Sequence, residues 1–227
     1  VLVIGTIHGD HLTSQTFGLE VLRAAIRQYQ PELVLTEISP NRFERARREF
    51  AEQGTITEPR VARFPEYVDV LFPLTRELTF EIVPTAGWNV PMDKFRKAAL
   101  ARIEADPAWR DRWASYQRAQ ARSDSAIRAG GAGDDPRWIH TKGWDRAESI
   151  YLDVYQDLLG DELGTGGWDR INRAHFANIA GALDRVAGQG KRVLIIYGAG
   201  HKVWFLKALA RRSDVRLVDP LPFFPDR

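Results

Sequence analysis

The sequence predicts an α/β fold, in which a mainly parallel β-sheet is flanked by helices. Short runs of aliphatic and β-branched residues occur early, in the middle and late in the chain. Segments with helical spacing of apolar residues separate these runs, and such alternation is typical of parallel sheets. The runs "VLVI" and "VLIIY" are continuously apolar, as expected for strands that are buried on both faces.

The first half of the chain alternates strands and helices. Thr13 or Ser14 can cap the start of the first helix, Pro31 ends it, and Gly54 stops the second helix. Pro84 ends the third strand. In chain order, the expected elements are a strand at 1–4, a helix at 14–30, a strand in "ELVLTEI", a helix in "SPNRFERARREFAEQG" and a strand in "TFEIVPTAGW".

The middle third of the chain has few strand signals. It is rich in Ala, Arg and Trp, and its most loop-like segment is "RAGGAGDDPRW". We expect one α/β domain over 1–227, with a helical insertion or cap at 91–165. The expected elements of the second half are helices at 91–120, 145–159 and 168–187, a strand at 192–197, a helix at 201–212 and a strand at 215–218.

The composition excludes several classes of protein. Lys and Arg number 32 and Asp and Glu number 30, and the densest basic run, "RFERARREF", is interleaved with glutamates at helical spacing. We therefore expect no nucleic acid as a partner. The absence of cysteine excludes disulfides, thiolate catalysis and cysteine-based zinc sites. No apolar stretch is long enough for an integral membrane segment.

The start of the chain gives little information about location. Val1 lies inside the first expected strand and no initiator Met precedes it. We therefore expect that an upstream segment has been removed, and a signal peptide is one such segment. The sequence specifies neither the compartment nor the oligomeric state.

Three ionisable residues follow three of the expected strands. His8 comes after the first strand in "GTIH", Glu37 ends the second in "VLTEI", and His201 follows the late strand in "GAGH". In open α/β sheets, ligands bind at the carboxyl ends of the strands, where loops converge. Because burying several ionisable groups at one edge is costly without a function, these three residues are predicted to form the functional site.

Other histidines and acids are weaker candidates for the site. Asp10 could orient His8 or accept a proton in the reaction, whereas His11 is expected to be an ordinary loop residue. His140 is expected at the surface, beside the glycine-rich loop. His175 shares a helical stripe with apolar residues, which favours a packing role.

A nucleotide-binding corner is the rival interpretation of "GAGH". A strand, a G-x-G sequence and a helix precede a strand that ends at Asp219, as in dinucleotide-binding folds. However, Val203 stands where the third glycine is needed, and too little chain follows for the remaining strands. A Walker loop is also excluded, because "GAGHKV" lacks the GK[ST] ending.

The ordered set of "GTIH", the glutamate of "VLTEI" and "GAGH" resembles the signature of the TraB/Tiki superfamily, in which two G-x-x-H motifs flank a glutamate. That superfamily includes GumN-like proteins, erythromycin esterases and ChaN-type haem-binding lipoproteins. The resemblance implies an erythromycin esterase/ChaN-like fold and an arginine in the helix before the second histidine strand. Arg173 is the candidate for this catalytic arginine, with Arg170 as a shifted alternative. The resemblance also favours an exported or periplasmic location.

The resemblance implies hydrolysis of a peptide, amide or ester bond, with a small molecule or a peptide as the substrate. In a metal-dependent version, which we prefer at this point, His8, Glu37 and His201 hold a divalent ion (Mn, Co, Zn or Fe) that activates water. In a metal-free version, Glu37 orients His8 as the general base, and His201 stabilises the oxyanion or protonates the leaving group. The alternative from a different class is a non-enzymatic binder of haem, iron or a small molecule.

Overall fold

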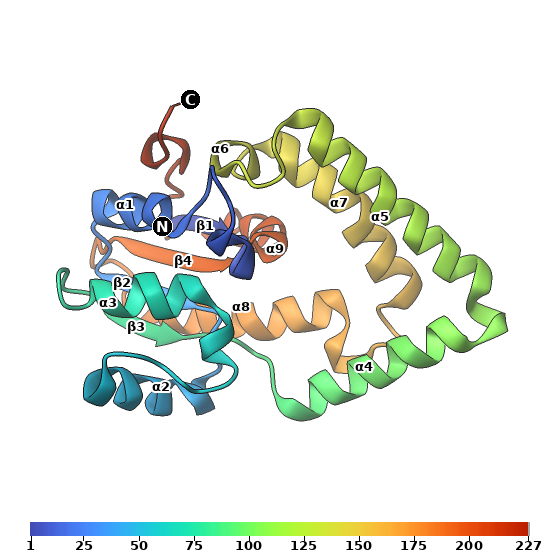
Figure 1. Ribbon diagram of the computed structural model, residues 1–227, viewed down its shortest axis with the longest axis horizontal. Helices are drawn as coiled ribbons and strands as arrows, with labels where there is room; N and C mark the ends of the chain where they lie inside the picture. Colours follow the sequence, from blue (N-terminus) through green and yellow to red (C-terminus); the bar gives the residue numbers. More distant parts are fainter. Residues whose placement is uncertain (227) are drawn as a thin grey trace.

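A computed structural model describes residues 1–226 and shows a four-stranded, all-parallel sheet flanked by helices (Figure 1). The strand order is β1-β4-β2-β3, so the first and the last strands along the chain lie side by side. The predicted α/β fold class is confirmed. The strands are β1 (Leu2–Thr6), β2 (Leu33–Thr36), β3 (Glu81–Pro84) and β4 (Val193–Gly198).

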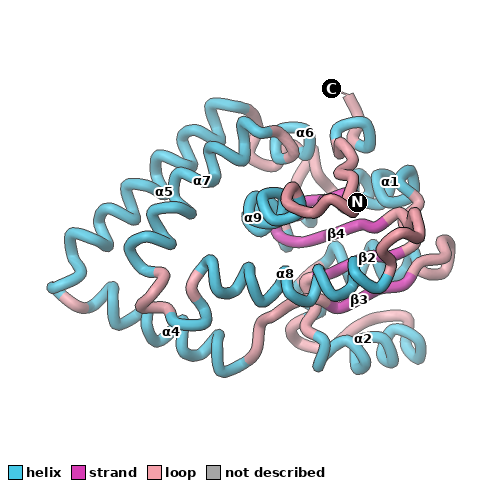
Figure 2. Tube along the Cα trace, turned by 180° about the vertical axis from the view of Figure 1, so that it is seen from behind, coloured by secondary structure: helices cyan, strands magenta, loops and turns pink. Residues whose placement is uncertain are grey.

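The strands are buried because their sequences are apolar on both faces. Every residue of β1, β2 and β4 is buried, whereas the edge strand β3 is partly exposed. One face of the sheet packs mainly against α1, α2 and α3, and the other against α8 and α9, which lie in front of the strands in Figure 2. These helices are α1 (Leu19–Tyr29), α2 (Pro40–Gln53), α3 (Phe72–Leu74), α8 (Trp168–Arg185) and α9 (Ala199–Leu209).

A helical middle region, α4–α8, connects β3 to β4 and extends beyond the carboxyl ends of the strands (Figure 1). Its long helices α5 and α7 pack along each other. The remaining α-helices are α4 (Val90–Ala105), α5 (Arg110–Gly130), α6 (Pro136–Ile139) and α7 (Lys142–Leu159). Short 3₁₀ helices span His8–Leu12, Val61–Arg63, Pro107–Trp109, Gly164–Gly166 and Leu221–Phe223, and a π-helix spans Glu66–Leu71.

The first helix starts later than the sequence predicts. The Ser14 hydroxyl accepts the backbone N–H groups of Thr16 and Phe17, at 3.2 and 2.7 Å. Ser14 therefore closes a turn of its own, and α1 begins only at Leu19. The helix predicted over 91–120 is also interrupted, because the Asp106 side chain caps a new helical turn.

The strand predicted at 215–218 is wrong. This segment contacts the start of β1 through two hydrogen bonds, from Val218 N to the Val1 carbonyl (2.9 Å) and from the Val1 amino group to the Arg216 carbonyl (2.7 Å). It makes no strand ladder in the described part of the chain. No helix within residues 1–226 is both long and apolar enough to span a membrane.

Candidate functional site

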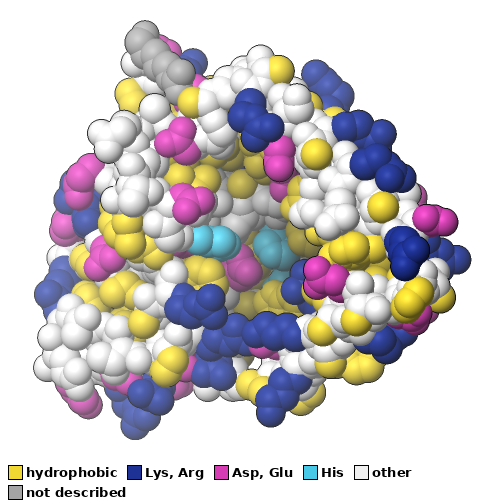
Figure 3. All heavy atoms as spheres, turned by 45° about the vertical axis from the view of Figure 1, so that its right-hand side comes forward, with side chains coloured by type: hydrophobic (Ala, Val, Ile, Leu, Met, Phe, Trp, Pro, Cys, Tyr) yellow, Lys and Arg dark blue, Asp and Glu magenta, His cyan; other side chains and the backbone are white. Residues whose placement is uncertain are grey.

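The carboxyl ends of the strands bring the three predicted residues together around one carboxylate. His8 follows β1, Glu37 follows β2, and His201 lies in the first turn of α9, directly after β4. His8 Nε2 is 3.9 Å from Glu37 Oε2, and His201 Nε2 is 3.7 Å from Glu37 Oε1. Figure 3 shows histidine side chains and an acidic side chain inside a hollow of the surface.

The Glu37 carboxylate is nearly enclosed, with 9% of its side chain exposed. The backbone N–H of Gly198 donates to Oε2 at 3.1 Å. The backbone N–H of Glu37 donates to the Tyr67 hydroxyl at 2.9 Å, which donates to the Ile196 carbonyl at 3.0 Å and so ties the end of β2 to β4. Burial raises the pKa of Glu37, although the charge of His8 and the Gly198 N–H oppose this effect. The carboxylate is therefore a better proton acceptor than an ordinary glutamate.

His8 is held by a buried acid. Its Nδ1 donates to Glu66 Oε1 at 2.7 Å, and the Thr6 hydroxyl donates to the same oxygen at 3.0 Å. Burial alone would lower the pKa of His8, but the hydrogen bond to Glu66 and the charges of Glu66, Glu37 and Asp10 outweigh it and raise the pKa. This environment favours the imidazolium form of His8.

Glycine is required where β4 ends beside His8. A Cβ atom at Gly198 would lie 2.5 Å from His8 Nε2, closer than non-bonded atoms approach. The His8 backbone itself has a φ of 49°, in the left-handed region that non-glycine residues rarely adopt. The strand end and the imidazole are thus fitted to each other, with local strain of the kind that accumulates at functional sites.

His201 presents a free lone pair to Glu37. Asn172 Nδ2 donates to the Trp168 carbonyl at 2.8 Å, so Asn172 Oδ1 faces His201 and accepts its Nδ1–H at 2.7 Å. The proton of the neutral ring is therefore on Nδ1, and Nε2 points its lone pair at the carboxylate. Burial, with smaller contributions from His175 and His8, lowers the pKa of His201 well below its usual range. His201 is neutral near pH 7.

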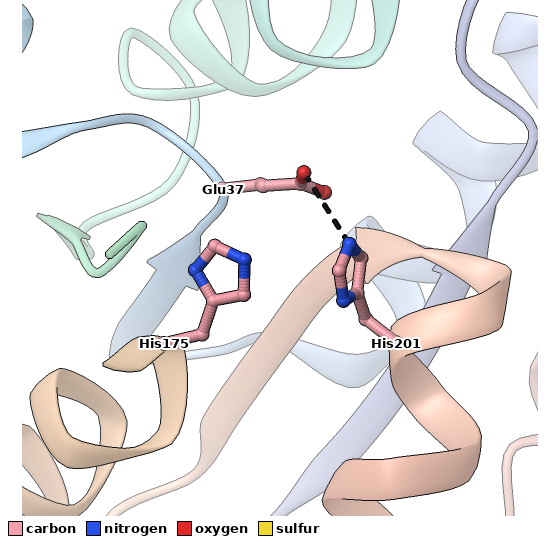
Figure 4. Close-up of side chains that lie close together, drawn as sticks. All are labelled: Glu37, His175 and His201. Carbon is pink, nitrogen blue, oxygen red and sulfur yellow. Dashed lines mark ion pairs between the residues drawn. The ribbon is translucent and has the colours of Figure 1, made fainter. Parts of the chain in front are cut away.

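His175 has the opposite arrangement. The backbone N–H of Gly87 donates to His175 Nδ1 at 2.7 Å, so the proton of the neutral ring is on Nε2. Figure 4 shows this Nε2 facing Glu37 and His201. The atom is buried and has no hydrogen-bond partner among residues 1–226. Burial lowers the pKa of His175 to about 3, so an N–H donor without an acceptor points into the site.

Gly87 makes this contact possible because it lies directly against α8. A Cβ atom at Gly87 would lie 2.6 Å from the Cβ of Ala174. The sequence predicted a packing role for His175, and the ring does pack edge-on to Tyr197, with the centroids 5.4 Å apart. The hydrogen bond from Gly87 turns the N–H of His175 toward the site. The spacing of apolar residues in the sequence gives no information about this contact.

Glu37, His175 and His201 form a group that could hold a metal ion, since their donor atoms lie within 4.8 Å of one another. The tautomers test this fit. His201 matches the usual pattern, in which a metal-binding histidine donates its second N–H to a neighbouring acceptor. His175 does not match, because its Nδ1 accepts a hydrogen bond and its Nε2 carries the proton. His8 lies outside this group, and its favoured imidazolium form carries a proton on Nε2.

The other sequence candidates lie away from the carboxylate. Asp10 is exposed in the 3₁₀ helix after β1 and acts on His8 through its charge. Arg173 is 73% exposed and pairs with Asp169 one turn earlier on α8, while Arg170 pairs with Asp161, so neither guanidinium faces Glu37.

Two further histidines are buried and hydrogen-bond to backbone groups. His11 was expected to be an ordinary loop residue, but it lies buried in the 3₁₀ helix after β1. Its Nε2 accepts from Ile7 N (3.3 Å) and its Nδ1 donates to the Phe17 carbonyl (2.6 Å). The expected surface position of His140 is wrong. His140 Nε2 accepts the buried Gly5 N–H at 3.0 Å, so the ring supplies an acceptor for the edge of β1.

A pocket of about 490 Å³ opens beside His8 and Glu37. Its size suits a small molecule or a short peptide segment. The residues that line it come from the segments after β1, β2 and β3, from the first turns of α2 and α4, and from the 3₁₀ helix before the π-helix and its flanking residues. They are His8, Gly9, Glu37, Ile38, Ser39, Asn41, Arg42, Arg60, Val61, Arg63, Phe64, Trp88, Asn89, Val90 and Asp93.

Comparison with models of protein families, with curated proteins and with solved structures gave no match to this chain. The functional interpretation of the candidate site is therefore based on its geometry.

Proposed function

We propose that this protein is a hydrolase that attacks an ester or amide bond with water activated at Glu37. The observation that carries the proposal is one buried carboxylate placed between two histidines of opposite character. His201 is kept neutral with a free Nε2, and His8 is favoured as an imidazolium by Glu66. Neighbouring groups whose environments drive their pKa values apart are typical of an acid and a base in catalysis.

The water-binding position lies between Glu37, His175 and His201. Three donor atoms up to 4.8 Å apart surround a point no more than about 2.8 Å from each, a normal hydrogen-bond distance for a water oxygen. The Nε2–H of His175 donates to that oxygen, while Glu37 and the His201 Nε2 accept its two hydrogens. All three contacts use the tautomers that the surrounding hydrogen bonds impose.

In the reaction, the water oxygen forms a bond to the acyl carbon and loses a proton to Glu37. His8 is 36% exposed and lines the pocket, so its Nε2–H can reach the leaving oxygen or nitrogen. Transfer of that proton accompanies cleavage of the acyl bond, and the proton on Glu37 returns through solvent. The role of Glu66 in holding His8 replaces the role that the sequence analysis gave to Glu37.

A metal-dependent version of the same hydrolysis is the second candidate. Glu37 and His201 have suitable donors, and a bound divalent ion would lower the pKa of a coordinated water and polarise a carbonyl. The third residue of the group, His175, would have to give up its hydrogen bond from Gly87 to become a ligand. This requirement favours the metal-free version.

The resemblance to the TraB/Tiki superfamily supports hydrolysis, and membership of that superfamily is itself part of the proposal. The alternative of haem binding has less support. It calls for an exposed imidazole beside an apolar groove, whereas His8 and His201 both point at a carboxylate.

The test is a screen of the purified protein, without an affinity tag, against esters, lactones, amides and short peptides. Each assay is run with a chelator and with added Mn, Co or Zn. We expect hydrolysis that persists in the presence of the chelator, in a protein without stoichiometric metal by elemental analysis. The His201→Ala variant should lose this activity, and the Arg173→Ala variant should keep it. Activity that requires a metal would select the second candidate. Full activity in both His8→Ala and His201→Ala would refute the assignment of the site.

A further inference from the structure

Three arginines line the pocket that opens beside His8 and Glu37: Arg42, Arg60 and Arg63. Figure 3 shows Lys and Arg side chains gathered along one rim of the hollow that contains the histidines. An aromatic residue, Phe64, links this rim to the reaction centre, since its ring centroid is 4.8 Å from that of His8. Charges on this rim would therefore lie close to a substrate whose scissile bond is at Glu37.

Two of the three arginines are fixed by acids of the protein itself. Arg42 pairs with Glu58, which is 1% exposed and also accepts the backbone N–H groups of Arg60 and Val61. Arg60 pairs with Asp93 of α4 at 2.9 Å. The charges of these two guanidinium groups are compensated, and the pairs hold that wall of the pocket in shape.

Arg63 differs from its two neighbours. It is exposed, and its guanidinium forms no hydrogen bond or ion pair with residues 1–226. It directly precedes Phe64 in the chain, and both residues line the pocket next to His8. A guanidinium offers several N–H donors in a plane that matches a carboxylate, phosphate or sulfate. An uncompensated guanidinium at the pocket wall is therefore a site for an anionic group.

We propose that the substrate is a small acyl compound with one anionic group, which Arg63 binds while the scissile bond lies at Glu37. The pocket volume of about 490 Å³ fits such a molecule, and the lining residues Phe64 and Trp88 can cover its apolar part. This inference deepens the proposed function and rests on it for the position of the scissile bond.

The first experiment compares two 4-nitrophenyl esters of equal chain length, the monoester of glutaric acid and the ester of pentanoic acid, after subtraction of the uncatalysed rates. The quantity measured is the ratio of kcat/KM for the anionic over the neutral ester. We expect Arg63→Gln to lower this ratio about 5- to 50-fold, between the values for an exposed ion pair and for a hydrogen bond to a charged group. Arg63→Glu should lower it further, and added salt should weaken the preference.

The matched control is Arg48→Gln, an exposed arginine of α2 that does not line the pocket. Its ratio should equal that of the wild type. A ratio that is unchanged in Arg63→Gln, or that falls equally in Arg48→Gln, would overturn the inference.

A second experiment separates this inference from the proposed function. Calorimetry measures the binding of glutarate, phosphate and sulfate to the wild type and to both variants, with no turnover required. Binding that Arg63→Gln removes and Arg48→Gln keeps supports the anion site even if neither ester is hydrolysed, and the tightest ligand identifies the anion. Absence of binding to the wild type, together with no preference between the esters, would overturn it.

Discussion

Replacing Glu66 by glutamine removes the charge that favours the imidazolium form of His8 and keeps the shape of the side chain. Glu66 is fully buried, and His8 Nδ1 donates to it at 2.7 Å. A hydrogen bond to a charged group contributes about 1.5–3 kcal/mol, and one pKa unit corresponds to about 1.4 kcal/mol. We therefore expect Glu66→Gln to lower the pKa of His8 by about 1 to 2 units, while the charges of Glu37 and Asp10 still act on the ring.

The sign of the effect on activity follows from the role of His8. In the proposed reaction the imidazolium donates a proton, so activity falls as the pH rises through the His8 pKa. A lower pKa moves this fall to lower pH. The pH dependence of kcat/KM measures it, and an NMR titration of the His8 ring measures the pKa without a substrate.

The control for this prediction is Asp10→Asn. Asp10 also raises the pKa of His8, but it is exposed and its charge is screened by solvent, so the shift should be clearly smaller. A pKa of His8 that is unchanged or higher in Glu66→Gln would refute the reasoning. So would an activity profile that does not follow the measured pKa.

Two further predictions test the packing around the site. Gly198→Ala should displace His8 and reduce kcat by about two orders of magnitude in a folded protein, because the new Cβ would lie 2.5 Å from His8 Nε2. The control is Gly181→Ala, which should keep wild-type activity because a Cβ atom there has no atom within 4 Å. Asp145→Ala leaves the buried Lys202 ammonium without its partner and should lower the free energy of unfolding by about 3 kcal/mol in urea titrations. An unchanged kcat in the first variant, or an unchanged stability in the second, would contradict these expectations.

The residues at the strand ends could be predicted from the sequence because local pattern determines them. A continuous apolar run marks a buried parallel strand, and parallel strands end at one edge of the sheet. His8, Glu37 and His201 therefore meet, although 161 positions separate Glu37 from Gly198, its hydrogen-bond partner at the end of β4. The need for glycine at the end of the strand, at Gly198 of "GAGH", could also be predicted from the sequence. The structure shows the reason, since a Cβ atom at Gly198 would collide with the His8 ring.

The groups that set the protonation states could not be predicted in this way. Glu66 lies in the π-helix between β2 and β3, Asn172 and His175 lie on α8, and tertiary packing brings each of them to the site. The one available signal for Glu66 was an acid inside the apolar run "FPEYVDVLF". For His175, apolar periodicity reported burial correctly, but the N–H of Gly87 determines which nitrogen carries the proton.

The failed strand at 215–218 shows a related limit. Its alternating valines have β-propensity, but a strand requires a partner with several free backbone groups. Val1 offers two hydrogen bonds, and further along β1 the Gly5 N–H already donates to His140 Nε2. β-propensity is a property of the segment itself, whereas strand pairing depends on which backbone groups of a neighbouring strand are free.

The most direct test of the central claim is the activity of Glu37→Gln on a substrate identified by the screen. Glutamine keeps the size of the side chain and can still accept the Gly198 N–H, but it cannot take a proton from water. With the fold verified by circular dichroism, kcat should fall by about 10²- to 10⁴-fold, the usual contribution of a general base. A folded Glu37→Gln variant with nearly wild-type kcat would contradict the account.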